Sequence, residues 1–383
     1  MYFDCSLFSK SVQLVVTLAV LLTMCWSSQS KDSENNNALT FVDAIDGKVF
    51  TQTGVGRFFA IDTETGSVLW SFHDANLRLF TRAVFRSGVL FVAATNSKSN
   101  SELIRFDSTT GKTNWRAPFV GLGGNASPVL CGGEVLVADY WHKTVSAFNV
   151  ATGKNDWRTD PLPLLFLFPP GVLDSTAIFV VADKRDHESK QQLVSISCEN
   201  GQLGKTLPVR VDGVSRTPVL LYKDTVVLSG YDRVRGTSLQ EIRKSDGTIL
   251  WSLMIPDEIA RFTPARQGNL LIAGAGSLWV IDLDTGRVAL HEALPMPTVP
   301  VDAANGLVFF SRGGQTVEAR ELQSGKLRWS AKLRGKISSN IAVSGNHLYV
   351  KTGDDQLVAL RMTGEVDRYL QIAGPGGPAT SSH

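Results

Sequence analysis

Residues that could do chemistry are few in this sequence and do not gather into a reactive motif. Of the four cysteines, Cys5 and Cys25 lie in or beside an apolar N-terminal segment, and Cys131 and Cys198 lie in the body of the chain. No Cys-x-x-Cys pair and no histidine at metal-ligand spacing accompanies them, so the pattern predicts neither a zinc site nor a redox motif. We expect Cys131 and Cys198 to be two small buried residues, with a disulfide between them as the alternative in an exported protein.

Histidine and acidic residues are dispersed in the same way. His73, His142 and His187 lie in different parts of the chain without ligand spacing, and we interpret them as loop residues. Asp43 and Asp302 are isolated, and we interpret them as turn residues. We therefore predict no catalytic residue, no metal site and no cofactor.

Four basic residues could act together through their charge. Each comes just before, or at the start of, an expected inner strand, where a closed ring of sheets would bring it to the mouth of a central funnel. They are Arg82, Arg216, Arg261 and Lys336. Four such charges around a narrow opening would focus a positive potential and attract an anion. The alternative is that each pairs with a nearby carboxylate or with solvent.

The overall charge gives no further indication of a ligand. The chain has 38 basic and 36 acidic residues, for a formal charge of +2. A balance this even provides no field that would recruit nucleic acid, and we expect no nucleic-acid partner.

The N-terminal segment is typical of an export signal. The apolar run over residues 12–24 suits a signal-peptide core better than a spanning helix, which needs about 20 residues. Residues 22–25 resemble a bacterial lipobox, in which the cysteine, here Cys25, becomes the lipid-modified first residue of the mature protein; Met24 stands where a small residue is usual. Ordinary cleavage just beyond Cys25 and a retained N-terminal anchor are the alternatives. We expect export, to the periplasm or outer membrane if the source is bacterial and by secretion otherwise.

A repeated hairpin organises the rest of the chain. In Phe58–Trp70 (FFAIDTETGSVLW) an alternating strand is followed by Asp, then Thr-Gly, then a second strand that ends in Trp. The motif occurs eight times at intervals of roughly 40–48 residues, which is the period of four-stranded propeller blades. Its glycines are Gly66, Gly111, Gly153, Gly201, Gly247, Gly286, Gly325 and Gly364. In such a turn the glycine takes the positive φ, and the Asp or Thr side chain accepts bonds from turn N–H groups.

A tryptophan follows the hairpin glycine by four residues in five of the eight copies. These tryptophans are Trp70, Trp115, Trp157, Trp251 and Trp329. We expect each to lie on the outermost strand of its blade and to dock against the adjacent blade. Lys205, Leu290 and Arg368 occupy this position in the other copies, and we expect those three seams between blades to be the loosest.

Upstream of each hairpin lies another pair of strand-like segments joined by a Gly, Asn or Asp turn, as in Thr217–Gly230. Each pair and the hairpin that follows it make one blade. The sequence therefore predicts an all-β protein, an eight-bladed β-propeller of four-stranded antiparallel blades over residues 39–373. A signal peptide at 1–25, a linker at 26–38 and a disordered tail at 374–383 complete the predicted organisation.

The Asp-x-x-Thr-Gly-x-x-x-Trp hairpin in eight copies resembles that of the pyrroloquinoline-quinone (PQQ) repeat family of β-propellers, over residues from about 40 to 373. Within this family, the length and the lipobox-like start are similar to the envelope lipoproteins that assist the assembly of outer-membrane β-barrel proteins. That resemblance implies a non-enzymatic protein-binding scaffold of the cell envelope, a monomer within a complex, whose partner is the barrel-assembly protein. It also implies a lipid anchor at Cys25.

The longest polar loops are expected on one face of the propeller. They connect the second and third strands of their blades, at Asn96–Glu102, Asp183–Gln192 and Tyr231–Ser238. We expect the protein partner to bind there, because varied loops on a rigid scaffold commonly carry binding. The apolar run Leu162–Phe168 is expected to form an over-long inner strand within the core. The alternative is that it forms a partly exposed patch for a partner.

Two alternatives to a scaffold remain. The first is a PQQ-dependent dehydrogenase, since such enzymes share the repeat. They hold the quinone on the propeller axis with a calcium ion, carboxylate and Asn ligands, an Asp base and a disulfide of adjacent cysteines, and we find no such group of residues in this sequence. The second alternative is a ligand- or anion-binding propeller that uses the four basic residues at the funnel mouth.

Overall fold

In the computed structural model the chain divides into two compact units, residues 1–38 and Leu39–His383. The structure describes residues 41–52, 57–74, 77–79, 81, 83–96, 101–119, 127–139, 142–162, 165–166, 169–182, 191–209, 211, 219–232, 234–256, 259–265, 269–274, 277–293, 302–312, 314–353 and 355–372. For Leu165–Phe166 and Ile259–Ala265 only the backbone is described. The predicted signal peptide, linker and C-terminal tail lie outside these residues.

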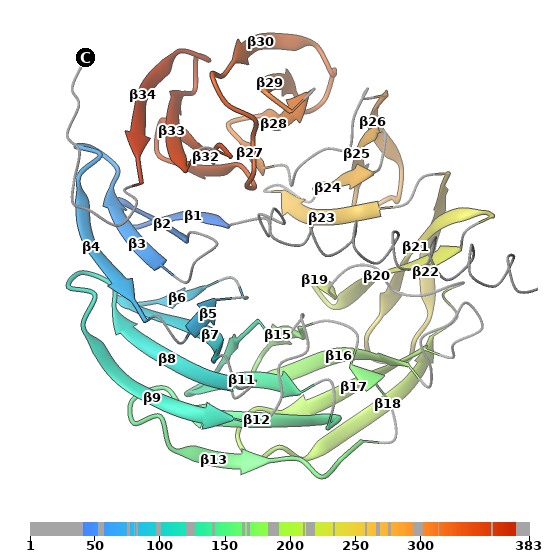
Figure 1. Ribbon diagram of the computed structural model, residues 1–383. Helices are drawn as coiled ribbons and strands as arrows, with labels where there is room; N and C mark the ends of the chain where they lie inside the picture. Colours follow the sequence, from blue (N-terminus) through green and yellow to red (C-terminus); the bar gives the residue numbers. More distant parts are fainter. Residues whose placement is uncertain are drawn as a thin grey trace, which may run out of the picture. The chain divides into compact units, whose positions relative to one another are not determined.

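The described residues form strands and no helix, which confirms the predicted all-β class. The strands make eight antiparallel sheets, each built from consecutive strands of the chain and arranged as the blades of a propeller (Figure 1). Neighbouring inner strands lie side by side from blade to blade, and the inner strand of blade 8 contacts that of blade 1. The eight-bladed propeller predicted from the hairpin repeat is thereby confirmed.

The first four blades span residues 42–209. Blade 1 contains β1 (Val42–Ile45), β2 (Lys48–Gln52), β3 (Arg57–Asp62) and β4 (Val68–His73). Blade 2 contains β5 (Leu77–Leu79), β6 (Val84–Arg86), β7 (Val89–Asn96), β8 (Ser101–Asp107) and β9 (Thr113–Phe119). Blade 3 contains β10 (Val129–Cys131), β11 (Glu134–Asp139), β12 (Thr144–Asn149) and β13 (Asn155–Arg158). Blade 4 contains β14 (Leu165–Phe166), β15 (Gly171–Leu173), β16 (Thr176–Ala182), β17 (Gln191–Ser197) and β18 (Leu203–Val209).

The other four blades span residues 220–371. Blade 5 contains β19 (Leu220–Tyr222), β20 (Thr225–Asp232), β21 (Gly236–Arg243) and β22 (Ile249–Ile255). Blade 6 contains β23 (Ile259–Ala265), β24 (Asn269–Gly274), β25 (Ser277–Asp282) and β26 (Val288–Ala293). Blade 7 contains β27 (Asp302–Ala304), β28 (Leu307–Arg312), β29 (Thr316–Glu321) and β30 (Leu327–Lys332). Blade 8 contains β31 (Ala342–Ser344), β32 (His347–Lys351), β33 (Gln356–Arg361) and β34 (Val366–Gln371).

In blades 2 and 4 two short strands share the inner position. In blade 2, β5 and β6 both pair with β7, and in blade 4, β14 and β15 both pair with β16. The apolar run Leu162–Phe168 contributes β14, which lengthens the inner edge of blade 4 as the core interpretation predicts. Leu162 is buried. The other side chains of the run lie outside the described residues, so the alternative of an exposed patch is not tested.

The hydrophobic core lies between the blades, because each sheet packs its face on the next. Leu136 and Val145 of blade 3 share one cluster with Phe179 of blade 4. Phe58 of blade 1 stacks on Phe106 of blade 2, with ring centroids 6.1 Å apart. Second and third strands are therefore apolar on both faces, as expected for strands that are covered on both sides.

The hairpin turns of blades 1 to 7 are of one kind, and that of blade 8 is one residue shorter. The glycine has a positive φ in every copy, which explains the need for a residue without Cβ. In blade 1, Asp62 Oδ1 accepts bonds from the backbone N–H groups of Glu64 (3.0 Å) and Thr65 (2.7 Å) and from the Thr65 hydroxyl. These bonds hold the pKa of Asp62 below its usual value. The register between the third and outer strands shifts at the hairpin of every blade.

Five seams between blades share one contact. The outer-strand tryptophan covers the hairpin glycine of the next blade, and its indole N–H donates to a carbonyl oxygen of that hairpin. The donor and acceptor pairs are Trp70 to Ser108 (3.0 Å), Trp115 to Val150 (3.2 Å), Trp157 to Cys198 (2.9 Å), Trp251 to Leu283 (2.9 Å) and Trp329 to Met362 (2.8 Å). The glycine serves the contact as well as the turn, since a Cβ on Gly111 would lie 2.5 Å from the ring of Trp70.

The three seams without tryptophan carry other contacts. Arg368 donates to the Glu64 carbonyl oxygen (2.6 Å), which joins blade 8 to blade 1. Lys205 donates to the Ser245 carbonyl oxygen between blades 4 and 5. Between blades 6 and 7, Leu290 lies over the hairpin glycine. At these three seams a basic or aliphatic side chain therefore contacts the next blade in place of the tryptophan.

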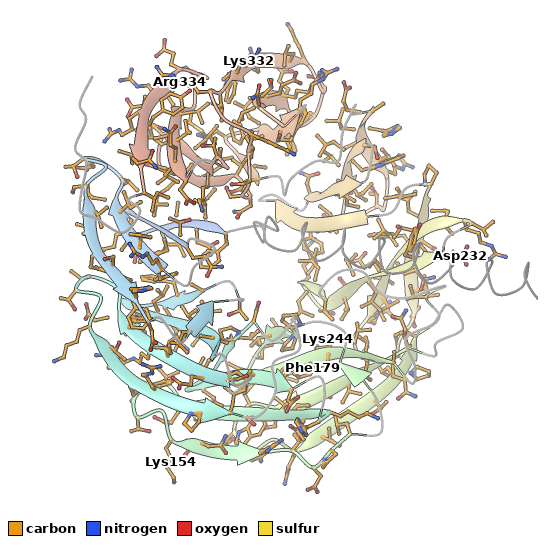
Figure 2. All side chains as sticks on the ribbon, in the orientation of Figure 1. Lys154, Phe179, Asp232, Lys244, Lys332 and Arg334 are labelled. Carbon is orange, nitrogen blue, oxygen red and sulfur yellow. A yellow bond between two sulfur atoms is a disulfide. The ribbon has the colours of Figure 1, made fainter. Side chains whose placement is uncertain are left out.

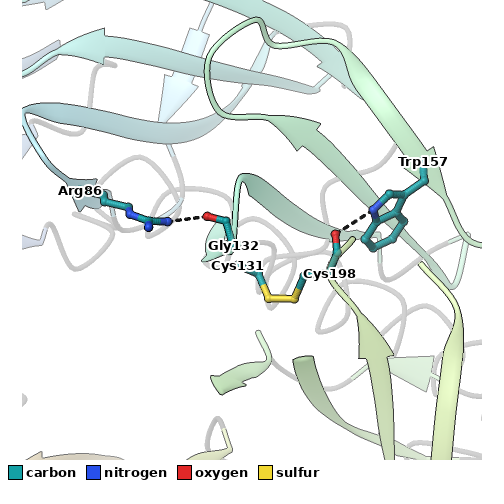
Figure 3. Close-up of a disulfide and its surroundings, with 5 residues drawn as sticks. All are labelled: Arg86, Cys131, Gly132, Trp157 and Cys198. Atoms are coloured by element: carbon teal, nitrogen blue, oxygen red, sulfur yellow. Dashed lines mark hydrogen bonds between the residues drawn. A yellow bond between two sulfur atoms is a disulfide. The ribbon is translucent and has the colours of Figure 1, made fainter. Parts of the chain in front are cut away.

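The expectation that Cys131 and Cys198 are two separate buried residues is wrong, because they form a disulfide (Figure 3). Cys131 ends β10 of blade 3, and Cys198 begins the Thr-Gly-type hairpin of blade 4. The sequence placed them 67 residues apart with nothing to pair them. The fold brings the inner-strand turn of one blade against the hairpin of the next, and so makes the pair.

Candidate interaction face

One end of the propeller carries the turns between second and third strands and the links between blades; we call this end the loop face. Its longest predicted loops, in blades 2 and 4, lie largely outside the described residues, at 97–100 and 183–190. The described parts that bear most on function are a hairpin of blade 5, a turn of blade 3 and a buried lysine where blade 8 meets blade 1.

The blade 5 hairpin projects as ordered strand. The sequence predicts a loop at Tyr231–Ser238, and this prediction is wrong. Strand β20 continues to Asp232, β21 begins at Gly236, and these two residues are paired. Asp232 Oδ1 accepts bonds from the N–H groups of Val234 (2.8 Å) and Arg235 (2.9 Å). Gly236 has a φ of 93°, and a Cβ there would lie 2.2 Å from the Ile255 carbonyl oxygen. The tip is therefore fixed by its own turn and by β22.

An apolar side chain stands at this tip. Val234 is 93% exposed, whereas the other exposed large hydrophobic side chains of the described residues are 36–54% exposed. Arg235 follows it, and its side chain is also exposed. Figure 2 shows Asp232, at the base of the tip, at the outer margin of blade 5. An exposed valine on a fixed hairpin offers a partner an apolar contact next to an arginine side chain.

The blade 3 turn holds a histidine against a buried carboxylate. His142 Nδ1 lies 2.7 Å from Asp139 Oδ2, and the His142 backbone N–H donates to Asp139 Oδ1 at 3.0 Å. Arg158 bonds the Thr144 hydroxyl and lies 3.9 Å from the same carboxylate. This places His142 in a turn, as predicted. The interaction orients the ring and stabilises the turn, and no hydroxyl or thiol nucleophile is bonded to His142 among the described contacts.

A buried lysine lies where blade 8 meets blade 1. Lys351 Nζ donates to the Gln52 carbonyl oxygen (3.3 Å) and pairs with Asp355 (2.7 Å). The Lys351 side chain is 4% exposed, so its ammonium depends on these two partners. The contact joins the second strand of blade 8 to the second strand of blade 1. It therefore helps to close the ring of blades.

The predicted basic ring is not tested. Arg82 and Arg216 lie outside the described residues, and Arg261 lies in β23, the inner strand of blade 6, where only the backbone is described. Lys336 is exposed in the link between blades 7 and 8. Its carbonyl oxygen accepts a bond from Gly353 N–H (2.8 Å), and its side-chain stem runs beside Gly314. The ring of four stays a prediction.

The inner-strand carboxylates do not resemble a quinone site. Asp43 and Asp302 lie in strands β1 and β27, so the interpretation of them as turn residues is wrong. Asp302 Oδ2 accepts a bond from Val343 N–H of blade 8 (3.2 Å), and its Oδ1 accepts from Ala303 N–H (2.8 Å). Among the described residues, no group of three or more His, Cys, Asp or Glu side chains is placed to hold a metal ion. The described donor set therefore does not fit a calcium-bound quinone.

Of the other residues named from the sequence, one lies elsewhere than predicted and two lie outside the described residues. His73 ends strand β4 instead of lying in a loop. Cys25 and His187 lie outside the described residues. Within the described part of the chain, no helix has the length and apolar character needed to cross a membrane. The projecting blade 5 hairpin was missed because its polar tip sequence is typical of a loop.

The sequence is similar to that of a known protein family. The chain matches the family described as the outer membrane protein assembly factor BamB over residues 25–160, 75–203, 141–305 and 298–375. Among curated proteins no match to the sequence was found.

Solved structures with a similar fold differ widely in origin. BamB from Moraxella catarrhalis is 13% identical, with a TM-score of 0.64 over 84% of this chain and 95% of that one. The computationally designed Ika8 protein is 12% identical, with a TM-score of 0.64 over 85% and 98%. Quinohemoprotein alcohol dehydrogenase from Comamonas testosteroni is 13% identical, with a TM-score of 0.59 over 82% and 71%. At these identities the likeness shows the fold alone.

Proposed function

This chain belongs to the family of the outer membrane protein assembly factor BamB, and on that basis we propose that it is a non-enzymatic, protein-binding scaffold of the cell envelope that serves outer-membrane protein assembly. The family supports the cellular role. The fixed, exposed tip of the blade 5 hairpin supports binding at the loop face. The partner in this proposal is the barrel-assembly protein of the same organism, and the propeller acts as a monomer within that complex.

The observation that carries the proposal is the exposure of Val234 on an ordered hairpin. Full burial of a valine side chain contributes about 1.5–3 kcal/mol. Because Asp232 and Gly236 already fix the tip, little conformational freedom is lost when a partner covers it.

The contacts of the inner-strand carboxylate Asp302 favour a scaffold over an oxidoreductase. Both carboxylate oxygens of Asp302 are engaged by backbone N–H groups of blades 7 and 8. A carboxylate in that role supports packing between blades. The closest similarity to a quinoprotein is in the fold, which unrelated activities share.

Binding of the purified partner tests the proposal. The mature protein is immobilised, and the soluble region of the barrel-assembly protein is passed over it. We expect saturable binding by the wild type and a loss of at least about tenfold in affinity for Val234→Glu, since about 1.4 kcal/mol corresponds to a factor of ten. Val366→Glu on β34 is the matched control, because Val366 is a valine at 36% exposure on blade 8. Absence of wild-type binding would refute the scaffold role.

Export and anchoring form a separate part of the proposal. We infer that the segment before residue 26 directs export and that Cys25 carries a lipid, which would place the propeller at the outer membrane facing the periplasm. Mass spectrometry of the mature N-terminus tests this, since lipidation adds acyl chains to a Cys25-initiated protein. A mature chain that starts beyond Cys25 would exclude the anchor and leave the protein in solution after export.

A further inference from the structure

The bond between Cys131 and Cys198 joins two blades that meet at one seam. The two Cα atoms are 5.7 Å apart, which is within the usual range for a disulfide. Each cysteine is 1% exposed and belongs to the cluster shared by blades 3 and 4. The link is therefore covalent, buried and located where two separate sheets pack.

The disulfide adjoins the docking tryptophan of the same seam. Trp157 donates to the Cys198 carbonyl oxygen at 2.9 Å and covers Gly201 of the same hairpin. On the other side, Arg86 of blade 2 donates to the carbonyl oxygen of Gly132, next to Cys131, at 2.5 Å. Figure 3 shows the disulfide with the two hydrogen bonds on either side of it, from Arg86 to Gly132 and from Trp157 to Cys198. Correct docking of the seam thus brings the two sulfur atoms together.

Blade 4 has a weaker contact on its other side. Its outer strand carries Lys205 in place of tryptophan, and the facing glycine of blade 5, Gly247, has no side-chain atom within 4 Å of a Cβ position. The disulfide is therefore the covalent attachment of a blade whose second seam lacks the usual aromatic contact. This position gives the bond a structural role that the hairpin repeat does not provide.

We propose that Cys131 and Cys198 are a thiol-oxidation site, closed by a disulfide-bearing oxidant as blade 4 docks on blade 3. One cysteine thiolate attacks the oxidant disulfide, forms a mixed disulfide and releases one oxidant thiolate. The second cysteine thiolate attacks the protein sulfur of that mixed disulfide and releases the other. The protein loses two electrons, and the oxidant is reduced to its dithiol. The protons of the two cysteines pass to the released thiolates or to solvent.

This site couples completion of the propeller to the redox state of its compartment. Before docking, both thiols are accessible to an oxidant; afterwards the bond lies in the core, out of reach of small thiols. A reducing compartment leaves the seam without its covalent link, whereas an oxidising compartment supplies it. The inference does not depend on the partner proposed above.

Refolding of the full-length protein with oxidised glutathione tests the pairing. Reduced, denatured protein is refolded with and without the oxidant, then denatured, alkylated and mapped by peptide mass. We expect Cys131 and Cys198 to escape alkylation after refolding with oxidant and both to be alkylated after refolding without it. Oxidation in denaturant should give glutathione adducts at the two cysteines instead of the bond. Alkylation of both after oxidative refolding would overturn the proposal.

Thermal melts provide a second, independent measurement. We expect Cys131→Ala, Cys198→Ala and the double variant to melt at one lowered temperature, because loss of either sulfur abolishes the same bond. Wild type refolded without oxidant should melt with them, several degrees below wild type refolded with oxidant. Additive losses in the double variant, or equal melting temperatures for wild type refolded with and without oxidant, would show that no bond joins the seam. Wild-type binding to the barrel-assembly protein is scored separately, so failure of one proposal is distinguishable from failure of the other.

Discussion

The Asn340 carboxamide bonds both backbone groups of Val42 and so joins the last blade to the first. Its Nδ2 donates to the Val42 carbonyl oxygen at 2.7 Å, and its Oδ1 accepts from the Val42 N–H at 3.0 Å. No strand is shared across this closure, because β1–β4 and β31–β34 form separate sheets. The Asn340 side chain, which is 8% exposed, therefore joins the two blades by hydrogen bonds where no pair of strands does so.

Replacement of Asn340 by alanine should destabilise the whole propeller. It leaves the buried N–H and carbonyl groups of Val42 without this partner, and each such group costs about 1–3 kcal/mol. Urea unfolding of Asn340→Ala measures the loss. Asn155→Ala, at an exposed asparagine of β13, is the control and should unfold with the wild type. Equal stability of the two variants would show that the closure does not depend on Asn340.

Loss of a docking tryptophan should destabilise one seam. Trp115→Ala removes the ring that covers Gly153 and the donor to the Val150 carbonyl oxygen. We expect a loss of about 3 kcal/mol, as for other large-to-small changes at packed aromatics. Trp115→Phe retains a ring but not the donor and should lose about 1 kcal/mol. If Trp115→Ala melts within a degree or two of the wild type, the docking role is wrong.

A hairpin glycine should tolerate alanine less well than a glycine in an open turn. Gly88 and Gly111 have positive φ values of 80° and 70°. Alanine at Gly88 meets nothing within 4 Å, so Gly88→Ala should lose only the backbone cost of about 1–2 kcal/mol. Alanine at Gly111 also collides with Trp70 and should lose measurably more. Chemical denaturation of both variants separates the backbone cost from the cost of the collision. Equal losses of stability would mean that Trp70 moves aside without cost.

The stability of blade 3 should depend on pH through Glu134. Burial, and then the nearby Asp156 carboxylate, raise the pKa of Glu134 from 4.5 to about 7. Below pH 4.5 Glu134 is protonated in both the folded and unfolded protein, so the favourable contribution of the neutral form is fully present. It is lost as the pH rises towards 7, where the folded protein must ionise a half-buried group beside another carboxylate.

Replacement of Glu134 by glutamine should remove this loss. The gain in melting temperature of Glu134→Gln over the wild type should be larger at pH 8 than at pH 4. Melts at pH 4, 6 and 8 measure it. Glu199→Gln, at an exposed glutamate of the blade 4 hairpin, should show the same difference from the wild type at each pH. A gain for Glu134→Gln that is independent of pH would contradict the interpretation.

The hairpins and the blade count could be predicted because their determinants are local. Gly66 must adopt a positive φ, and Asp62 must reach N–H groups two and three residues ahead. Both requirements fix the spacing between the turn residues, and this spacing recurs in the sequence with each blade. Trp70 adds an aromatic at a fixed distance from the glycine. The turn chemistry of a few residues therefore predicts the architecture of more than three hundred.

Two other contacts between blades could not be predicted from spacing. The Cys131–Cys198 bond and the Asn340–Val42 bonds join positions 67 and 298 residues apart, and only the curvature of the ring brings them together. The blade 5 hairpin resembles a polar loop in sequence because the paired residues near its tip, such as Asp232, Thr237 and Ser238, are polar, although Thr237 and Ser238 are buried. The basic ring rests on Arg82 and Arg216, outside the described residues, and remains a prediction.

A substitution at the seam between blades 4 and 5 should increase the stability of the propeller. Of the eight hairpin glycines, all of them described, only Gly247 has no side-chain atom within 4 Å of a Cβ position. Lys205→Trp restores the residue found at five other seams and places an aromatic ring over that glycine. The buried apolar area should add about 1–2 kcal/mol of stability, and the indole N–H can replace the lysine donor to the blade 5 hairpin.

Unfolding in urea compares Lys205→Trp with Lys332→Trp, a change at an exposed lysine that ends β30. We expect a higher midpoint for Lys205→Trp and no gain for Lys332→Trp. If both variants unfold at the wild-type midpoint, the gap over Gly247 is already filled in solution by the lysine stem, and the tryptophan contact is interchangeable with it at this seam.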